Sequence, residues 1–429
     1  MARMGEREQR GTPDLTRSTS RDTAPSRLQG VRALAVAPTA FFGDYGCHVR
    51  IVEEVRALAF HGVQTTVATY PFGRDVPGID VRRARLVPGQ RRAGPGSSLH
   101  KFSLDASLAA RSLSIASAAR PALVHGHLHE GALIGLGVAR TQRVPILLDF
   151  QGSMTSEMID HGFLAPHGLA RRGFGALERW IVARVDAIVT STRHGADLLV
   201  REFGCRAERI TVVPDAVSTD RFRPLWQTAS EDGHLARAAQ LKTALGVPLD
   251  RPVVVYLGLL AEYQGITHLL RAAQLVAEQG VAAHFLIMGF PGEDRYRALA
   301  ARLGIAASTT FTGAIPYERA AEYLALGDVA VAPKLSDTEG NGKLLNYIAM
   351  GLPTVAFDTS VSREILGDLG IYAPCGDWSA LAARLIATLQ NPRDAEERGK
   401  ALRCKAVAEH SWRQAVEPLL EVYSRLLGM

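Results

Sequence analysis

The stretch of the chain with the clearest potential for chemistry is a polar loop between an apolar run and a helical pattern. Residues 329–333 form a short apolar run, as expected for a buried strand of a parallel sheet. A loop with Gly340 and Gly342 follows, and apolar residues then recur at helical spacing until Gly351 and Pro353. The loop therefore lies between the carboxyl end of a strand and the start of a helix. Open α/β sheets bind ligands at this position, and free helix N–H groups there can hold an anion.

This segment resembles the donor-sugar loop of retaining glycosyltransferases of family 4, which have the GT-B fold. In that family a Glu, seven residues and a second Glu precede Ala-Met-Ala-x-Gly-x-Pro-Val. Here Gly351 and Pro353 match the end of the motif, Asn346 stands at the second Glu position, and Glu339 is the candidate for the first. The loop is one residue shorter than in the family, and an amide replaces one carboxylate. An ordinary β-α-β unit without a site is the alternative, but long polar loops at strand ends usually carry function.

Length and composition limit the classes to which the protein can belong. With 429 residues, 47% of them hydrophobic, the chain is expected to form two domains. The net charge of +6 is mild and no nucleic-acid-binding signature is found, so no nucleic-acid partner is expected. Its four cysteines lack C-x-x-C spacing, which predicts neither a zinc site nor a disulfide framework and fits a cytoplasmic protein. No apolar run reaches the length of about 18 residues needed to span a membrane, and the N-terminus lacks the apolar core of a signal peptide.

The first half of the chain alternates between strand and helix patterns. Residues 1–28 are polar and predict a disordered tail, and residues 31–38 predict a first strand. A glycine-bearing loop and a helix from Val49 follow, which favours a parallel, doubly wound domain. In the resembled family this loop covers the acceptor and the donor phosphates. The acceptor-side loop implied here consists of Gly43, Asp44, Tyr45 and Gly46.

A basic region lies next to a predicted helix in this half. Its arginines, in a segment expected to be a loop, are Arg82, Arg83, Arg85, Arg91 and Arg92. Apolar residues at helical spacing between 104 and 115 follow. Basic and apolar residues side by side can approach anionic lipid headgroups, and solvated arginines on a loop are the plainer alternative.

Three histidines cluster after a short apolar run. His125, His127 and His129 would share one face if the strand continued, as in a metal site, but Gly126 indicates that the strand ends there. In the resembled family the second His of a His-x-His lies beside the anomeric carbon of the sugar, and His127 is the match. A buried histidine that bonds a backbone carbonyl is the alternative.

The second half of the chain begins after a segment that resembles the family's crossing between domains. Residues 210–224 match that crossing, although Asp215 and Ala216 replace the usual Asn-Gly. A fresh strand and helix series starts near residue 251. The expected organisation is a tail at 1–28, an acceptor-side domain at 29–224, a linker at 225–250, a donor-nucleotide domain at 251–405, and a helix at 406–429 that packs back on the first domain.

One departure from the family concerns the donor diphosphate. Family members carry an Arg and a Lys that clamp it, and Leu259 and Gln264 stand at these positions. Diphosphate binding depends strongly on charge-assisted bonds, so other cations must contribute. Lys334, Lys343 and Arg363 are the candidates, assisted by backbone N–H groups near the glycines.

The resemblance implies an α/β protein of GT-B fold, with two Rossmann-like domains facing each other across a cleft. It implies transfer of a sugar from a nucleotide diphosphate sugar, with retention and without metal or cofactor, to a glycan, lipid or small-molecule acceptor. His127 and Glu339 are the implied catalytic residues. The implied donor-binding residues are Gly258, Gln264, Lys334, Gly340, Gly342, Lys343, Leu344 and Asn346. A catalytically inactive binding subunit and another sugar-nucleotide enzyme, such as an epimerase, are the alternatives. The basic region also allows a peripheral contact with the inner membrane face.

Overall fold

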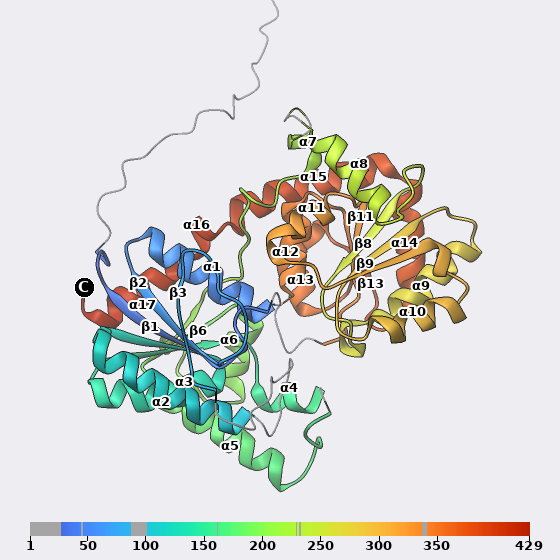
Figure 1. Ribbon diagram of the computed structural model, residues 1–429. Coiled ribbons are helices and arrows are strands. Elements are labelled where there is room, and N and C mark those ends of the chain that lie inside the picture. The colour runs from blue at the N-terminus through green and yellow to red at the C-terminus, as the bar shows by residue number, and fades with distance from the viewer. Residues whose placement is uncertain are drawn as a thin grey trace, which may run out of the picture.

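The computed structural model describes residues 27–43, 46–86, 101–160, 162–228, 230, 233–336 and 341–429. They form two α/β domains that lie next to each other, each built on one parallel sheet (Figure 1). The prediction of two Rossmann-like domains is therefore confirmed. The expected tail and the loop residues Asp44, Tyr45, Glu339 and Gly340 lie mostly or wholly outside the described residues.

The first sheet has the strand order β3-β2-β1-β4-β5-β6-β7, with all neighbours parallel. Its central strands are buried along nearly their whole length and are mostly apolar, although His125, His127 and Asp149 are buried among them. The strands are β1 (Arg32–Ala37), β2 (Gln64–Thr69), β3 (Asp80–Arg83), β4 (Leu123–His127), β5 (Ile146–Phe150), β6 (Ala187–Thr190) and β7 (Ile210–Val212).

Helices cover both faces of this sheet. They are α1 (Gly46–Phe60), α2 (Lys101–Ala119), α3 (Leu128–Gln142), α4 (Met154–Asp160), α5 (Leu169–Arg184), α6 (Arg193–Arg201) and the 3-10 turn η1 (Ala207–Arg209). Helices α2, α3 and α5 pack on one face, and α1 lies on the other (Figure 1). That second face is completed by α17 (Glu417–Leu427) from the C-terminus, whose Leu419 and Tyr423 are buried against Leu58 and Leu147. The helix that ends the chain thus packs on the first domain.

The second sheet has the order β10-β9-β8-β11-β12-β13 and is also parallel throughout. Its strands are β8 (Val253–Leu257), β9 (His284–Met288), β10 (Thr309–Gly313), β11 (Val329–Ala332), β12 (Thr354–Phe357) and β13 (Ile371–Ala373). Its helices are α9 (Ile266–Glu278), α10 (Glu293–Arg302), α11 (Ala320–Leu324), α12 (Gly342–Ala349), α13 (Ser360–Leu366), α14 (Trp378–Gln390) and α15 (Pro392–Glu409). Its 3-10 turns are η2 (Glu262–Gln264), η3 (Ala306–Ser308), η4 (Tyr317–Arg319) and η5 (Gly367–Leu369).

The predicted linker is more ordered than its weak sequence pattern indicated. Residues 225–250 contain α7 (Leu225–Thr228) and α8 (His234–Ala244), and Leu241 and Leu245 pack against the core of the second domain. The weak sequence pattern of this segment did not indicate these helices, and the packing of Leu241 and Leu245 holds α8 on the second domain. The chain passes between the domains before these helices and again after α15.

The two crossings lie next to each other. The backbone N–H of Val217 in the first crossing donates to the carbonyl of His410 in the second crossing. Val217 and Ser411 also form an isolated β-bridge between the two crossings. After the second crossing, α16 (Trp412–Ala415) and α17 return to the first domain. Helix α15 is a separate element that the sequence pattern did not predict.

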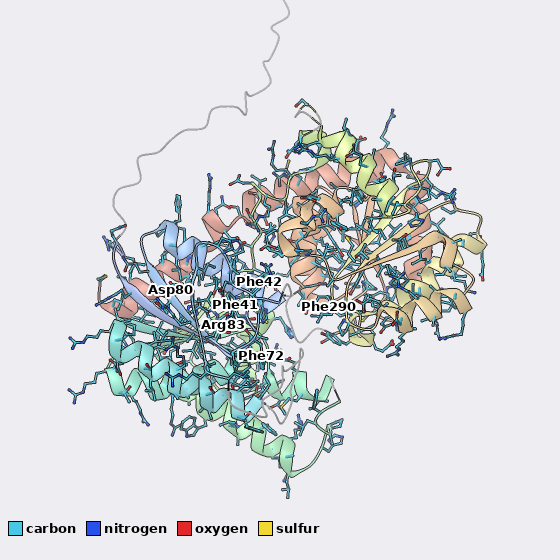
Figure 2. The ribbon with its side chains drawn as sticks, viewed as in Figure 1. Phe41, Phe42, Phe72, Asp80, Arg83 and Phe290 are labelled. Atoms are coloured by element: carbon cyan, nitrogen blue, oxygen red, sulfur yellow. The ribbon has the colours of Figure 1, made fainter. Side chains whose placement is uncertain are left out.

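Aromatic residues join the domains near the crossings. Phe42 packs on Tyr317 with ring centroids 6.4 Å apart, and Tyr317 packs on Phe222 at 5.6 Å. Figure 2 shows Phe41 and Phe42 at the edge of the first domain that faces the second, with Phe290 across from them. This packing makes one buried cluster continuous between the two domains.

The basic region is partly a strand and not the expected loop. Arg82 and Arg83 lie in β3, and Arg83 Nη1 donates to the carbonyls of Phe41 and Phe72, both at 2.7 Å. These two bonds hold the Arg83 guanidinium group against the backbone of its own domain. Arg91 and Arg92 lie outside the described residues. Of the helices that the structure describes, none is both long and apolar enough to cross a membrane.

Candidate functional site

A cavity of about 340 Å³ lies between the domains, where the carboxyl ends of both sheets meet. The strand order reverses between β1 and β4 in the first sheet and between β8 and β11 in the second. Doubly wound sheets bind ligands at such reversals. The residues after these strands, including Thr39, Leu128 and Gly258, line the cavity together with the start of α12.

Lys343 is the cation at the wall that the second domain supplies. Its Nζ donates to Gln264 Oε1 at 2.6 Å and to Tyr256 OH at 3.2 Å, and it lies 4.4 Å from the centre of the Tyr256 ring. Gly258 has φ +148°, and a Cβ added there would lie 3.0 Å from Lys343 Nζ. A side chain at residue 258 would therefore crowd the ammonium group. The geometry brings a lysine to Gln264, the position where the resembled family has one.

Asn341 precedes α12 and has the marks of a ligand-binding side chain. It is 3% exposed and lines the cavity. Neither its amide oxygen nor its amide nitrogen has a hydrogen-bond partner among the residues that the structure describes. A buried polar group without a partner costs free energy, about 1–3 kcal/mol, which a ligand would recover. Asn341 directly precedes the N-terminus of α12, where the first N–H groups of a helix can hold an anion.

The structure brings most of the predicted donor-side residues together. Gly258, Gln264, Gly342, Lys343 and Asn346 line the cavity. The other two described members lie elsewhere. Leu344 is fully buried in the hydrophobic core, and Lys334 is 3% exposed and does not line the cavity, so their side chains cannot contact a ligand there. Arg363, another candidate cation, is paired with Asp358 at 2.7 Å outside the cavity.

On the acceptor side, Gly46 begins α1 and lines the cavity, whereas Gly43 does not. The backbone N–H of Gly43 donates instead to His48 Nδ1 at 2.7 Å. This bond ties the start of the loop to the helix that follows it.

The histidine prediction requires a correction. Strand β4 does not end at Gly126 but continues to His127, whose side chain is 1% exposed and does not line the cavity. The ring of His127 stacks on that of His125 at 4.3 Å, because the two lie on one face of the strand. The chain reaches the cavity only at the next residues, where His129 and Glu130 begin α3 and line the wall.

His129 and Glu130 were therefore missed from the sequence. Their signal was present, since the residues after a strand in a parallel sheet lie at its carboxyl edge. The expectation that the strand ends at Gly126 was wrong; it followed from the rule that a glycine is usually unfavourable within a strand. Position 126 in β4 requires a glycine, because a Cβ there would lie 2.6 Å from the Cα of Ala132 on α3.

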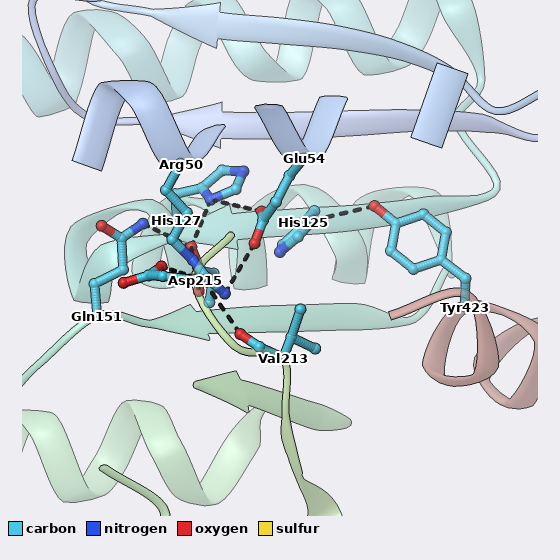
Figure 3. Close-up of polar contacts among 9 residues, drawn as sticks. Arg50, Glu54, His125, His127, Gln151, Val213, Asp215 and Tyr423 are labelled. Carbon is cyan, nitrogen blue, oxygen red and sulfur yellow. Dashed lines mark hydrogen bonds and ion pairs between the residues drawn. The ribbon is translucent and has the colours of Figure 1, made fainter. Parts of the chain in front are cut away.

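Behind this wall lies a buried network centred on Arg50 and Asp149 (Figure 3). Arg50 Nε lies 3.2 Å from Asp149 Oδ1, and Arg50 Nη1 donates to Asp215 Oδ1 at 2.6 Å. Asp149 Oδ2 also accepts from Gln151 Nε2 at 2.6 Å and lies 3.0 Å from His127 Nδ1. Arg50, Gln151 and Asp215 all line the cavity. Asp149 thus holds Arg50 and Gln151 in position from the side that faces away from the cavity.

The charges in this network follow from burial and pairing. Burial alone would raise the pKa of Asp149, but Arg50 and His127 hold it below its usual range, so Asp149 is an anion. Burial outweighs Arg50 at Glu54 and raises the pKa of that carboxyl well above its ordinary value. Burial also lowers the pKa of His125, which accepts or donates one hydrogen bond with Tyr423 OH at 3.1 Å. The network therefore links the cavity wall to the C-terminal helix.

Three members of the network have atoms close enough to bind a metal. Ligand atoms of Glu54, His125 and His127 lie within 4.8 Å of one another. His129 is not part of this group, contrary to the arrangement that three histidines on one face would give. Arg50 Nη2 lies 2.9 Å from Glu54 Oε1, so a guanidinium cation is already next to the Glu54 carboxyl group. One ring nitrogen of each histidine is engaged within the network, that of His125 by Tyr423 and that of His127 by Asp149.

Comparison with known proteins gives concordant matches over most of the chain. Residues 251–391 match a family model described as glycosyl transferases group 1, and residues 45–216 match one described as glycosyl transferase 4-like domain. The D-inositol 3-phosphate glycosyltransferase of Acidothermus cellulolyticus is 30% identical over 408 residues, covering 89% of this chain and 86% of that protein. The 2-deoxystreptamine glucosyltransferase of Streptomyces kanamyceticus is 26% identical over 300 residues, covering 69% of this chain and 72% of that protein.

Solved structures share the fold at lower identity. The sucrose-phosphate synthase of Thermosynechococcus elongatus aligns with a TM-score of 0.77 at 18% identity, covering 93% of this chain and 99% of that one. Anabaena HepE in complex with UDP-glucose aligns with a TM-score of 0.72 at 14% identity, covering 92% of this chain and 99% of that one. The two-domain arrangement is thus the one found in these proteins.

Proposed function

The chain belongs to the glycosyl transferases of group 1, which have the GT-B fold, and we propose that it transfers a sugar from a nucleotide diphosphate sugar with retention and without a metal ion. The observation that carries this proposal is Lys343, whose ammonium group lies at Gln264 in the cavity. It supplies a positive charge where the family's diphosphate clamp is missing. Anabaena HepE, which shares the fold, was solved in complex with UDP and with UDP-glucose, which supports a nucleotide donor for this chain.

The departing diphosphate needs its negative charge stabilised while the anomeric carbon becomes cationic. Lys343 and the N-terminus of α12 direct positive charge at the same point, and preorganised dipoles of this kind are a major source of catalysis. The amide of Asn341 faces the same space and can bond a phosphate or sugar oxygen. We assign Asn346 to the ribose hydroxyls and retain Glu339, which lies outside the described residues, as the sugar-binding carboxylate implied by the resemblance.

The imidazole nearest the sugar is assigned to His129 instead of His127. His129 is at the wall, whereas His127 bonds Asp149 behind it. In the reaction the bond from the anomeric carbon to the phosphate oxygen breaks, a bond to an acceptor oxygen forms on the same face, and the acceptor proton passes to the departing diphosphate. Enclosure between two domains keeps out water, the competing acceptor.

We place the reaction in the cytoplasm. The spacing of the four cysteines does not suggest a disulfide framework, which supports a reducing compartment. A glycan, a lipid or a small molecule could accept the sugar, and a lipid acceptor would call for contact with the inner membrane face. No cofactor beyond the nucleotide sugar is required by this scheme.

A panel of nucleotide diphosphate sugars tests the proposal. At least one should raise the melting temperature of the protein and then be hydrolysed slowly to nucleoside diphosphate and free sugar, with its anomeric configuration retained when followed by NMR. Binding without hydrolysis or transfer would favour the inactive binding subunit. Conversion of the donor into a second sugar nucleotide would favour the epimerase. The absence of binding by any nucleoside diphosphate would contradict the proposal altogether.

A further inference from the structure

Helix α5 presents an outer surface with an apolar centre. Leu169 is 84% exposed and Trp180 is 39% exposed, although both are large apolar residues. With about 3.6 residues per turn, they fall on one line along the helix together with Ala176 and Ala183, which are also exposed. The line that faces solvent is thus apolar, whereas an ordinary surface helix places its polar residues there.

Arginines flank this apolar line on both sides. Arg172 and Arg179 lie on one side of it, about two turns apart, and Arg184 lies on the other. All three are exposed, and neither Arg172 nor Arg179 forms an ion pair with a residue that the structure describes. The Cζ atom of Arg184 lies 4.2 Å from the centre of the Trp180 ring. The outer face of α5 therefore combines apolar and cationic groups.

The neighbouring helices extend this surface. Helices α2 and α3 lie beside α5 on the same face of the first sheet (Figure 1). Phe102 and Leu113 on α2 are 64% and 39% exposed, and Leu133 on α3 is 40% exposed. Single exposed apolar residues are common on protein surfaces, but here they gather on one layer of helices. We call the outer surface of α2, α3 and α5 the helical face.

The charge of the helical face is positive. Its three helices contain seven Lys and Arg residues and three acidic ones. Residues 87–100 and His161, which the structure does not describe, include no Asp or Glu and so supply no carboxylate to it. Each acidic residue of the three helices is buried or half-buried and accepts a hydrogen bond inside the domain: Asp105 from Tyr70 OH, Glu130 from Lys101 Nζ, and Glu178 from Ser153 Oγ.

We propose that the helical face docks onto an anionic lipid surface, with α5 lying in the plane of the headgroups. An apolar line flanked by basic residues is the pattern of a helix at a membrane interface. Leu169 and Trp180 enter the boundary between headgroups and acyl chains, where an indole ring is favoured. Arg172 and Arg179 meet the lipid phosphates, which attract basic residues near the membrane surface.

Other occupants fit this surface less well. A nucleic acid would pair with the arginines through its phosphates but would leave Leu169 and Trp180 without an apolar partner. A second copy of the chain, docked through the same face, would place one set of arginines against another. The lipid surface alone matches both the charge and the apolar centre.

This inference goes beyond the proposed function, because the docking residues are separate from the cavity. Leu169, Arg172, Arg179 and Trp180 do not line it. Helix α4, whose first residue Met154 does line the cavity, packs on α5. A docked protein therefore holds the first domain, with its wall of the cavity, close to the membrane.

Binding to vesicles of defined composition tests the docking directly. The full-length protein is sedimented with vesicles of phosphatidylcholine alone, or of phosphatidylcholine and phosphatidylglycerol in equal parts. It should bind the anionic vesicles at least about tenfold more tightly, and added salt should weaken this binding because exposed charges are screened. Equal binding to both vesicles, or binding to neither, would overturn the proposal.

A charge-matched pair of double variants locates the contact. Arg172→Gln with Arg179→Gln should weaken binding to anionic vesicles roughly thirtyfold, since each basic residue near the surface contributes about fivefold. Arg302→Gln with Arg393→Gln removes the same charge from exposed sites of the second domain and should leave binding within about twofold. Equal losses in the two double variants would reduce the effect to net charge and contradict the proposed face.

The indole of Trp180 reports whether the apolar line enters the membrane. Lipids with brominated acyl chains quench the fluorescence of an inserted tryptophan. Trp180→Phe should lose most of this quenching, whereas Trp226→Phe, which removes a 48% exposed tryptophan outside the helical face, should retain it. Quenching that survives in Trp180→Phe would place the membrane contact elsewhere.

The remaining controls separate this inference from other partners and from the proposed function. Binding of a mixed-sequence oligonucleotide without binding of vesicles would assign the arginines to nucleic acid and overturn the proposal. A dimer in analytical ultracentrifugation that Trp180→Ala dissociates, again without vesicle binding, would assign the face to a second copy. Donor hydrolysis is measured without vesicles and should be equal in all these variants, so its loss in the parent protein contradicts the transferase and not the docking.

Discussion

At the scale of single residues, the proposal for the donor wall is that one side chain takes over a role from another part of the chain. The family's clamp cations are absent at Leu259 and Gln264, yet Lys343 brings an ammonium group to Gln264 from the start of α12. The charge reaches nearly the same place from a different element. This exchange predicts that charge at this point, and not the identity of the residue that carries it, determines diphosphate binding.

Lys343→Met should weaken binding of a nucleoside diphosphate roughly ten- to a hundredfold, since a hydrogen bond to a charged group contributes about 1.5–3 kcal/mol. Binding of the bare nucleoside should change little, because it lacks the phosphates. Calorimetric titration of both ligands measures the difference, with Lys400→Met on the surface of the same domain as the control. Adding Gln264→Lys should restore binding. Equal loss for both ligands would place the diphosphate elsewhere.

His129 and His127 should separate function from stability. His129→Ala should lower donor hydrolysis roughly tenfold or more, the equivalent of about 1.4 kcal/mol, because His129 lines the cavity. His127→Ala should instead lower the free energy of unfolding by about 1–3 kcal/mol, since it leaves the buried Asp149 with one fewer partner. Hydrolysis per folded molecule and urea unfolding are measured for both variants. A large loss of hydrolysis in His127→Ala with stability intact would reverse the assignment.

Asp105 predicts a pH dependence of stability. Burial, with a smaller effect from Glu130, raises the pKa of Asp105 to about 6. A carboxyl with a raised folded pKa contributes stability below its unfolded pKa, and this contribution is lost as the pH rises from about 4 to about 6. Asp105→Asn keeps the oxygen that accepts from Tyr70 OH and removes the charge. The free energy of unfolding of the variant, measured relative to that of the parent, should therefore rise by roughly 1–2 kcal/mol as the pH increases from 4 to 7. A constant difference across this range would show that Asp105 does not titrate there.

At the scale of elements, α15 holds the two crossings together although the sequence pattern did not indicate it. Arg403 on this helix donates from Nη1 to the carbonyls of Phe222 and Ala349, at 2.7 and 2.8 Å, and from Nη2 to that of Thr219 at 3.0 Å. Its guanidinium group thus joins the first crossing to the end of α12. The helix that begins at the donor site is fixed at its far end by the segment that links the domains.

Arg403→Met should lower the free energy of unfolding by about 2–4 kcal/mol, because three backbone carbonyls lose a donor and the new side chain cannot replace it. Arg398→Met lies on the same helix and removes only a surface pair with Asp394, so its effect should stay within about 0.5 kcal/mol. Urea unfolding compares the two variants. Similar small losses in both would mean that the Arg403 bonds contribute little.

At the scale of the whole molecule, the site exists only where the domains meet. Phe42 packs on Tyr317 beside the ion pair of Arg74 and Glu318, in which Nη2 lies 2.8 Å from Oε2. The exposed ion pair contributes little by itself, and the aromatic contact is part of the buried cluster that is continuous between the domains. Tyr317 also lines the cavity, so the contact that joins the domains borders the enclosed site.

Phe42→Ala should favour a more open arrangement and raise the radius of gyration measured by small-angle X-ray scattering with nucleoside diphosphate bound. Acceptor-dependent transfer should fall more than nucleotide binding, since the donor wall lies within the second domain. Phe60→Ala, which removes an exposed phenyl group from the same domain, should change neither quantity. Unchanged scattering and transfer in Phe42→Ala would show that other contacts hold the domains.

The sequence by itself determined the layers and one wall of the site. Alternating apolar runs and helical patterns predict both parallel sheets, and the glycine loop before α12 predicts the donor wall, because the periodicity of a strand or helix is a property of neighbouring residues.

The tertiary structure decided the rest. Lys343 and Gln264 are 79 residues apart, and Arg50 and Asp149 are 99 apart, so no local pattern indicates that they meet. The place of His129 at the site was missed, because a shift of two residues along the chain separates the buried His127 behind the wall from His129, which lines the cavity. Helix α8 forms in a polar segment because the second domain covers its two leucines. Packing between distant parts of the chain sets these positions, and it is fixed only when the whole fold closes.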